Sequence, residues 1–267
     1  MPERIYLERQ NRTLTITLDR PDKRNALDAQ MVGELKDVLA SEEESDDVRV
    51  IVLTGAGSVF SAGADLQALK DLRDASLMEN RADSKHLAEL FEQICTHSKP
   101  VIAKINGHAI AGGCGLAAVC DFAYAAQGAK LGFSETRIGF VPAIVMVYAR
   151  RKIGETALRD LLLRGRLMDA SEGADMGLIN EVVTPSALDS HVDAIAEDIA
   201  TETSGSAVAL TKQMLAQVPG MGRREALDYA INMNAFARGT DDCQAGIQSF
   251  LDKTPAPWKA NASSDQE

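Results

Sequence analysis

Two segments made of small residues are candidates for holding an oxygen atom of a ligand. Residues 61–65 read Ser-Ala-Gly-Ala-Asp and residues 111–113 read Ala-Gly-Gly, and each follows a hydrophobic run and opens an expected helix. The first N–H groups of a helix have no partner within it, and they lie at its positive end. Two such segments at one sheet edge can point two N–H groups at one oxygen, which stabilises an enolate. The alternative is that the glycines only allow tight packing between strand and helix.

Glu135 is the candidate group for proton transfer. It follows Phe133 and Ser134 in an otherwise apolar stretch. Burial there would raise its pKa from about 4.3 toward neutral pH and make it a useful acid or base. The alternative is a glutamate that caps N–H groups where a helix begins. On the residues alone, both interpretations remain open.

Composition and motifs exclude several classes of function. The 267 residues include 28 Lys and Arg against 39 Asp and Glu, a net charge of −11, which argues against nucleic acid and anionic membranes as partners. Neither GxxxxGK[ST] nor a GxGxxG after a strand is present, which argues against nucleotide chemistry. The four cysteines show no CxxC pair, so we expect reduced thiols and no metal site. The charged N-terminus and the lack of a long apolar run predict a cytoplasmic protein.

The elements expected around these residues alternate between strands and helices. Hydrophobic runs predict buried strands at 48–53 and 100–105, and an earlier hairpin is expected to turn at Asn11 and Arg12. The polar residues ahead of an expected helix at 84–96 are interpreted as a mobile excursion. Two successive units of strand, glycine loop and helix indicate an α/β core whose parallel strands carry the loops at their carboxyl ends. Further helices are expected at 144–153, 154–164, 170–176, 186–203, 205–217, 222–236 and 240–251.

Four strings carry a resemblance to a known family. DRPDKRNAL, VLTGAGSVFSAGADL, PVIAKINGHAIAGGCGLAAVCDF and LGFSETRIGFVP occur in this order and resemble the enoyl-CoA hydratase/isomerase (crotonase) family over about residues 3–255. The resemblance implies a crotonase-like ββα spiral core, which we assign to residues 1–200. It also implies a helical C-terminal trimerisation region at 201–267, and therefore a homotrimer or homohexamer.

The resemblance also assigns the residues of the reaction. Ala64 and Gly112 match the family positions whose backbone N–H groups hold the thioester carbonyl oxygen, and Glu135 matches one of two catalytic glutamates. The expected substrate is an acyl-CoA. No further cofactor is expected, because CoA is part of the substrate. The residues that match the CoA-binding positions are Lys23, Arg24, Ala26, Ala62, Asp65, Leu66, Phe250 and Lys253, of which the last two reach in from a neighbouring subunit in some family members.

The chain departs from the family pattern at position 115. Hydratases with two glutamates carry the first one three residues after the oxyanion glycine, and here that residue is Gly115. The first hypothesis is a hydratase of a 2-enoyl-CoA, such as a branched or carboxylated one of the methylglutaconyl-CoA type, with Glu135 as single acid/base. The alternatives are a Δ3-Δ2-enoyl-CoA isomerase and a non-catalytic CoA-binding protein. Candidate substitutes for the missing carboxylate are His108, Arg137 and Tyr148.

Overall fold

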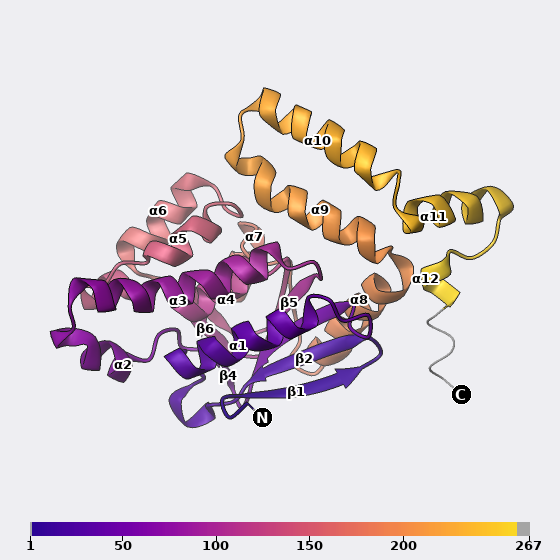
Figure 1. Ribbon diagram of the computed structural model, residues 1–267. Helices are drawn as coiled ribbons and strands as arrows, with labels where there is room; N and C mark the ends of the chain where they lie inside the picture. The colour runs from indigo at the N-terminus through magenta and orange to yellow at the C-terminus, as the bar shows by residue number, and fades with distance from the viewer. Residues whose placement is uncertain (1, 261–267) are drawn as a thin grey trace.

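A six-stranded sheet forms the centre of the computed structural model, which describes residues 2–260 (Figure 1). Its order is β1-β2-β3-β5-β7-β10, in which β1 and β2 are antiparallel and the other neighbours are parallel. The strands are β1 (Ile5–Gln10), β2 (Thr13–Leu18), β3 (Val50–Gly55), β5 (Val101–Ile105), β7 (Phe122–Ala126) and β10 (Glu181–Val183). The predicted hairpin is confirmed, because Asn11 and Arg12 link β1 to β2 with positive φ angles of 47° and 60°.

A second, smaller sheet carries the functional loops. Its order is β4-β6-β8-β9, with β4, β6 and β8 parallel to one another. The strands are β4 (Val59–Ser61), β6 (His108–Ile110), β8 (Lys130–Gly132) and β9 (Leu167–Asp169). Hydrophobic periodicity in the sequence did not predict β4, β6 or β9, since three residues are too few to show a period of two. The glycine segments therefore follow strands of this small sheet and do not leave the large sheet directly.

Helices cover both faces of the large sheet. Alternate residues of β3 enter two separate hydrophobic clusters: Ile51 and Leu53 pack in the larger one, and Val50 and Val52 pack in the smaller one, to which α8 contributes. This confirms the predicted strand that is buried on both faces. The helices of the core are α1 (Ala29–Glu42), α2 (Leu66–Asp71), α3 (Leu77–Thr96), α4 (Gly112–Val119), α5 (Ala143–Ala149), α6 (Glu155–Arg164), α7 (Ala170–Asp175) and α8 (Leu188–Glu202).

The polar segment interpreted as a mobile excursion is helical. Helix α3 begins at Leu77, well before the expected 84, because Ser76 and Glu79 form a capping box: each side chain accepts from the backbone N–H of the other. Helix α2 and a short 3-10 turn at 72–74 precede it. The predicted start of this helix at 84 was wrong because the hydrophobic stripe that indicates a helix starts only in the second half of α3, where Leu90, Phe91 and Ile94 are buried.

The C-terminal helices form an arm without a core of its own. They are α9 (Gly205–Gln217), α10 (Arg223–Ala237), α11 (Asp241–Asp252) and α12 (Pro257–Ala260). Figure 1 shows α9, α10 and α11 extending from one end of the molecule. Within the described part of this arm, Lys212 is the single buried residue, while Phe236 and Phe250 are 64% and 84% exposed. The division at residue 200 stays a prediction, since α8 runs across it, and residues 261–267 of the expected region lie outside those described.

Candidate active site

Three parallel strands of the small sheet bring the predicted reaction residues together. Strands β4, β6 and β8 lie side by side and run in the same direction. Ala64 follows the end of β4, Gly112 follows β6, and Glu135 follows β8, each within three residues of the strand. Because the carboxyl ends of parallel strands meet at one edge, the three segments converge there. The fold thus unites residues that are 71 positions apart in the chain (135 − 64).

The backbone N–H of Ala64 points away from the segment that supports it. Leu27 pairs with Ala64 in a parallel bridge: the Leu27 N–H donates to Gly63 O at 2.8 Å, and the Asp65 N–H donates to Leu27 O at 3.1 Å. In such a bridge, the N–H of the residue between the two bonded neighbours points to the opposite side. The Ala64 N–H is therefore directed away from Leu27, and within residues 2–260 it donates to no protein group.

Gly112 lies next to this N–H group. A Cβ atom on Gly112 would lie 3.5 Å from the Ala64 nitrogen. The preceding residue, Ala111, has φ 52° and ψ −124°, a strained conformation for a residue with a side chain. The Ala111 N–H donates to Gly132 O at 2.8 Å, so strand β8 holds this turn. The Gly112 N–H, like that of Ala64, has no acceptor in the described chain, and the pair has the arrangement of an oxyanion hole.

Glu135 presents a buried and unpaired carboxylate oxygen. It begins the 3-10 turn Glu135–Ile138 and is 8% exposed. Its Oε2 atom has no hydrogen-bond partner among the residues described. Burial raises the pKa of Glu135, against a smaller lowering by its own backbone N–H. A carboxyl group with a raised pKa and a free oxygen is suited to take up a proton from a ligand and to release it again.

The position of the missing glutamate is occupied by another side chain. A Cβ atom at Gly115 would lie 2.2 Å from Cγ1 of Val145 and 3.1 Å from Cε2 of Phe91. Val145 belongs to α5 and is buried. An apolar side chain therefore fills the space where a first carboxylate would begin.

The three candidate substitutes are held elsewhere. His108 is exposed at the start of β6, where its Nδ1 lies 3.0 Å from the Lys130 backbone nitrogen. Tyr148 donates to Glu92 Oε2 at 3.1 Å, and its burial and this carboxylate raise its pKa. Arg137 donates to Arg164 O at 3.3 Å. Each of the three substitutes is thus engaged in a contact of its own within the described structure, whereas Glu135 Oε2 is free.

The basic turn at Lys23 and Arg24 lies against the oxyanion segment. Both side chains are exposed, and Arg24 adopts the left-handed conformation with φ 53°. The Ala62 N–H donates to Arg24 O at 3.0 Å, which joins the turn to the strand end ahead of Ala64. Ala26 is buried beneath the turn, and Leu66 is 63% exposed at the start of α2. Two exposed cations beside the oxyanion segment are available for the phosphates of a ligand.

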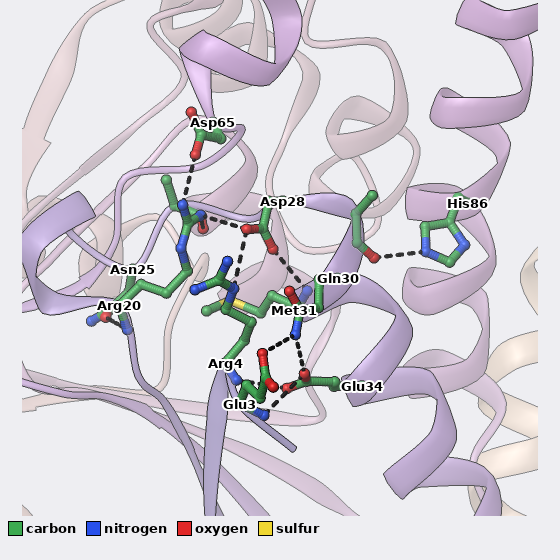
Figure 2. A network of polar contacts seen from close by, with 12 residues as sticks. Glu3, Arg4, Arg20, Asn25, Asp28, Gln30, Met31, Glu34, Asp65 and His86 are labelled. Atoms are coloured by element: carbon green, nitrogen blue, oxygen red, sulfur yellow. Dashed lines mark hydrogen bonds and ion pairs between the residues drawn. The ribbon is translucent and has the colours of Figure 1, made fainter. Parts of the chain in front are cut away.

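The Asp65 carboxylate is engaged within the protein. Its Oδ2 accepts from Arg20 at 2.9 Å, and its Oδ1 accepts from the Gln67 N–H at 2.9 Å. Burial raises the pKa of Asp65, but the bonds from Arg20 and from two N–H groups of α2 outweigh this and leave the pKa lowered. Figure 2 shows Arg20 between Asp65 and Asp28. Sequence reasoning missed Arg20, although its place directly before Pro21 in the first string was an available signal of a special turn.

Phe250 and Lys253 do not approach this site within one chain. They lie on α11 and at its end, and α11 packs on α9 and α12. In Figure 1, α11 and α2 are at opposite ends of the molecule. Their predicted contact with CoA therefore requires a second copy of the chain.

Comparison with known proteins identifies the family. The family model described as "Enoyl-CoA hydratase/isomerase" matches residues 8–261. The chain belongs to the enoyl-CoA hydratase/isomerase family. It is an enzyme of this family with the crotonase fold. The roles of Ala64, Gly112 and Glu135 stay predictions.

Relatives of the family match nearly the whole chain. A protein of Thermus thermophilus, provisionally named an enoyl-CoA hydratase, is 40% identical over 90% of this chain and 94% of its own. A crotonyl-CoA hydratase of Syntrophomonas wolfei is 33% identical over 95% of this chain and 97% of its own. The crystal structure of an enoyl-CoA hydratase of Mycobacterium smegmatis has a TM-score of 0.89, with 29% identity over 96% of this chain and 99% of the other. None of the described helices is long and apolar enough to cross a membrane.

Proposed function

We propose that the protein hydrates a 2-enoyl-CoA thioester, with Ala64 and Gly112 as the oxyanion hole and Glu135 as the acid/base. The observation that carries the proposal is the convergence of two unpaired N–H groups and a carboxyl group with a free oxygen at one sheet edge. The relatives named as enoyl-CoA and crotonyl-CoA hydratases support the same reaction class. CoA enters as part of the substrate, and the reaction consumes only water, so the proposal includes no further cofactor.

One carboxyl group is sufficient for the proton transfers of hydration. The Glu135 carboxylate takes a proton from water as the water oxygen bonds to C3 of the enoyl group. The electron pair of the C2–C3 double bond moves to the thioester, where the enolate oxygen is held by the N–H groups of Ala64 and Gly112. Protonated Glu135 then returns the proton to C2, which regenerates the carboxylate. Its raised pKa makes the carboxylate a stronger base in the first half of this cycle.

The isomerase is a second candidate, favoured by Val145 at the place of the missing glutamate. A 3-enoyl-CoA would lose a proton from C2 to Glu135 and form a dienolate, whose oxygen the N–H groups of Ala64 and Gly112 would hold. Glu135 would then return the proton to C4 as the double bond moves to C2–C3. This reaction needs no activated water. The free carboxylate oxygen of Glu135 argues against the third alternative, a protein that only binds CoA.

A cavity lies beside Ala64. It has a volume of about 330 Å³ and is lined mainly by apolar side chains, with three carboxylates and one histidine among them. Of these carboxylates, Asp28 and Asp65 are paired with Arg20. Arg4 also lies 3.4 Å from Asp28, so two arginines balance these two carboxylates, and the charge of the cavity does not select between a neutral and a carboxylated acyl chain. The lining side chains are Leu27, Asp28, Ala29, Val32, Ala64, Asp65, Ala68, Leu69, Asp83, His86 and Leu87.

A homotrimer, or a hexamer made of two trimers, would complete the CoA site. The exposed apolar residues of the C-terminal arm, including Leu227, Ile231 and Phe236, are suited to burial against a second copy. Such an assembly would bring Phe250 and Lys253 of one subunit to the basic turn of another. Sedimentation of the full chain tests this, and a monomer would contradict it.

The decisive experiment compares the wild type with Glu135→Gln on crotonyl-CoA, 3-methylglutaconyl-CoA and a 3-enoyl-CoA. Absorbance of the conjugated thioester reports hydration as a loss and isomerisation as a gain. Because one relative is named a crotonyl-CoA hydratase, we expect turnover of crotonyl-CoA above that of the carboxylated substrate, and its loss in the variant. Turnover of the 3-enoyl-CoA alone would establish the isomerase instead. If CoA binds but none of the three reacts, both enzymatic proposals are wrong.

A further inference from the structure

We propose that Arg20 is the positioning residue of the oxyanion hole, acting through Asp65 on the backbone N–H of Ala64. This inference rests on the proposed function. The Arg20 side chain is 10% exposed and contacts three groups from two separate segments. Its Nη1 donates to Ala26 O at 2.7 Å and lies 3.1 Å from Asp28 Oδ2, while its Nη2 donates to Asp65 Oδ2 at 2.9 Å.

Asp65 is the residue through which Arg20 reaches the hole. It directly follows Ala64, and its backbone N–H donates to Leu27 O, one of the two bonds that direct the Ala64 N–H outward. Its other carboxylate oxygen accepts from the first turn of α2. One side chain thus joins the supporting bridge, the start of α2 and Arg20. A shift of Asp65 would rotate the adjoining peptide, which carries the Ala64 carbonyl, and disturb the bridge.

Asp28 and Ala26 hold the other side of the same bridge. Asp28 caps α1 by accepting from the Met31 N–H at 2.8 Å, and its second oxygen faces Arg20 (Figure 2). These two residues flank Leu27, as Gly63 and Asp65 flank Ala64. The planar guanidinium, with several donors in a fixed geometry, therefore connects both strands of the bridge at once. A lysine at this position would supply a single ammonium group, so it could not connect both strands of the bridge at once.

The hydrogen bonds of Asn25 also hold the same segment. Its buried side chain accepts from the Arg20 N–H at 3.0 Å and donates to Ala56 O and Val59 O at 2.9 and 2.7 Å. Ser61 donates to Asn25 O at 2.8 Å. The turn is thereby hydrogen-bonded to the oxyanion segment both before β4 and after it. The same turn exposes Lys23 and Arg24, so the candidate phosphate site and the hole share one rigid support.

The test compares Arg20→Gln, Arg20→Lys and Asp65→Asn with the wild type. We expect kcat to fall at least about tenfold while KM for the thioester changes less than about threefold, because misplacing a catalytic group lowers the rate more than binding. Arg20→Lys should recover only part of the loss. In Asp65→Asn, the amide can still accept from α2, but it offers Arg20 no negative charge. The double variant should be little worse than Arg20→Gln, since the two side chains act as one unit.

Arg166→Gln is the matched control. Arg166 also bridges two carboxylates, Asp160 and Glu172, and lies outside the catalytic and CoA-binding residues. It should lower the melting temperature without the fall in kcat. An equal loss of kcat in Arg166→Gln and Arg20→Gln, or an unchanged kcat in Asp65→Asn, would overturn the proposal. Asp65→Asn decides the question if Arg20→Gln does not fold.

Hydrogen exchange separates this inference from the proposed function. In the wild type, the N–H groups of Ala62 and Asp65 are bonded to Arg24 O and Leu27 O, so they report how firmly the segment is held. Exchange in a peptide covering 61–66 should be faster in Arg20→Gln and Asp65→Asn and unchanged in Arg166→Gln. A wild type without thioester turnover would contradict the proposed function, whereas unchanged exchange in both variants would contradict the role of Arg20.

Discussion

Val145 and Gly115 occupy one space: Cγ1 of the valine lies 2.2 Å from where a Cβ on the glycine would stand. The absence of a carboxylate at 115 is therefore matched by a buried hydrophobic residue from another helix. This pairing makes the two positions interdependent, so a carboxylate can return to 115 only if Val145 is removed.

Gly115→Glu alone should destabilise the protein, by about 1–3 kcal/mol from overpacking, and should not accelerate hydration of crotonyl-CoA. The double variant Gly115→Glu with Val145→Gly should melt at a higher temperature than Gly115→Glu and hydrate faster than Val145→Gly. Thermal melts and initial rates of the four proteins measure this coupling. A Gly115→Glu protein as stable as the wild type would show that position 115 has more room than the structure gives it.

Glu135→Gln should lower turnover by about 10²- to 10⁴-fold and raise stability at pH 7. The pKa of Glu135 in the folded protein lies above its ordinary value of 4.5, so the folded state holds the proton more tightly than the unfolded chain. The contribution of this group to the free energy of unfolding is fully present below pH 4.5 and is lost as the pH rises through the raised pKa.

Melting temperatures of the wild type and Glu135→Gln between pH 4 and pH 8 check the sign. The melting temperature of Glu135→Gln should exceed that of the wild type most at pH 8, and this difference should shrink toward pH 4. A gap that grows as the pH falls would mean that the carboxylate is stabilised by the fold, contrary to its buried and unpaired oxygen.

Ala111→Gly and Gly63→Ala should have opposite effects. Ala111 has φ 52° and ψ −124°, where glycine is less strained, so its replacement should leave the hole intact and stability equal or higher by about 1 kcal/mol. Gly63 has φ 85°, and a Cβ there would lie 2.7 Å from the Gly112 nitrogen. Gly63→Ala should therefore abolish most activity. Melting curves and kcat for both variants test this, and an active Gly63→Ala enzyme would contradict the position assigned to the hole.

Reversing the charge of the basic turn should weaken binding of the thioester. Lys23→Glu or Arg24→Glu should raise KM by about twofold to fivefold at low salt, because exposed charges contribute modestly, and should leave kcat unchanged. The effect should shrink at high ionic strength. Arg159→Glu, at a side chain that is 67% exposed on α6, changes the net charge equally and should not alter KM. An equal rise in KM for Arg159→Glu would show that the effect comes from the net charge of the protein and not from the basic turn.

The residue types of this chain, together with the family resemblance, indicated candidate groups for the reaction. Segments of glycine and alanine can offer only backbone groups, and a glutamate in an apolar string indicates a raised pKa, so sequence and resemblance single out Ala64, Gly112 and Glu135 as candidates. The long buried strands and most helices were predicted because their hydrophobic patterns extend over enough residues to show a period.

Only the tertiary structure placed these residues in relation to one another. Strands β4 and β6 are three residues long, too short to leave a pattern, yet with β8 they set the edge where the site forms. Gly115 indicates a missing carboxylate, but the side chain that replaces it comes from Val145, 30 residues later (145 − 115). Only the folded structure brings the carboxylates of Asp28 and Asp65 to Arg20. Such contacts depend on how distant segments pack, and local sequence carries no record of that.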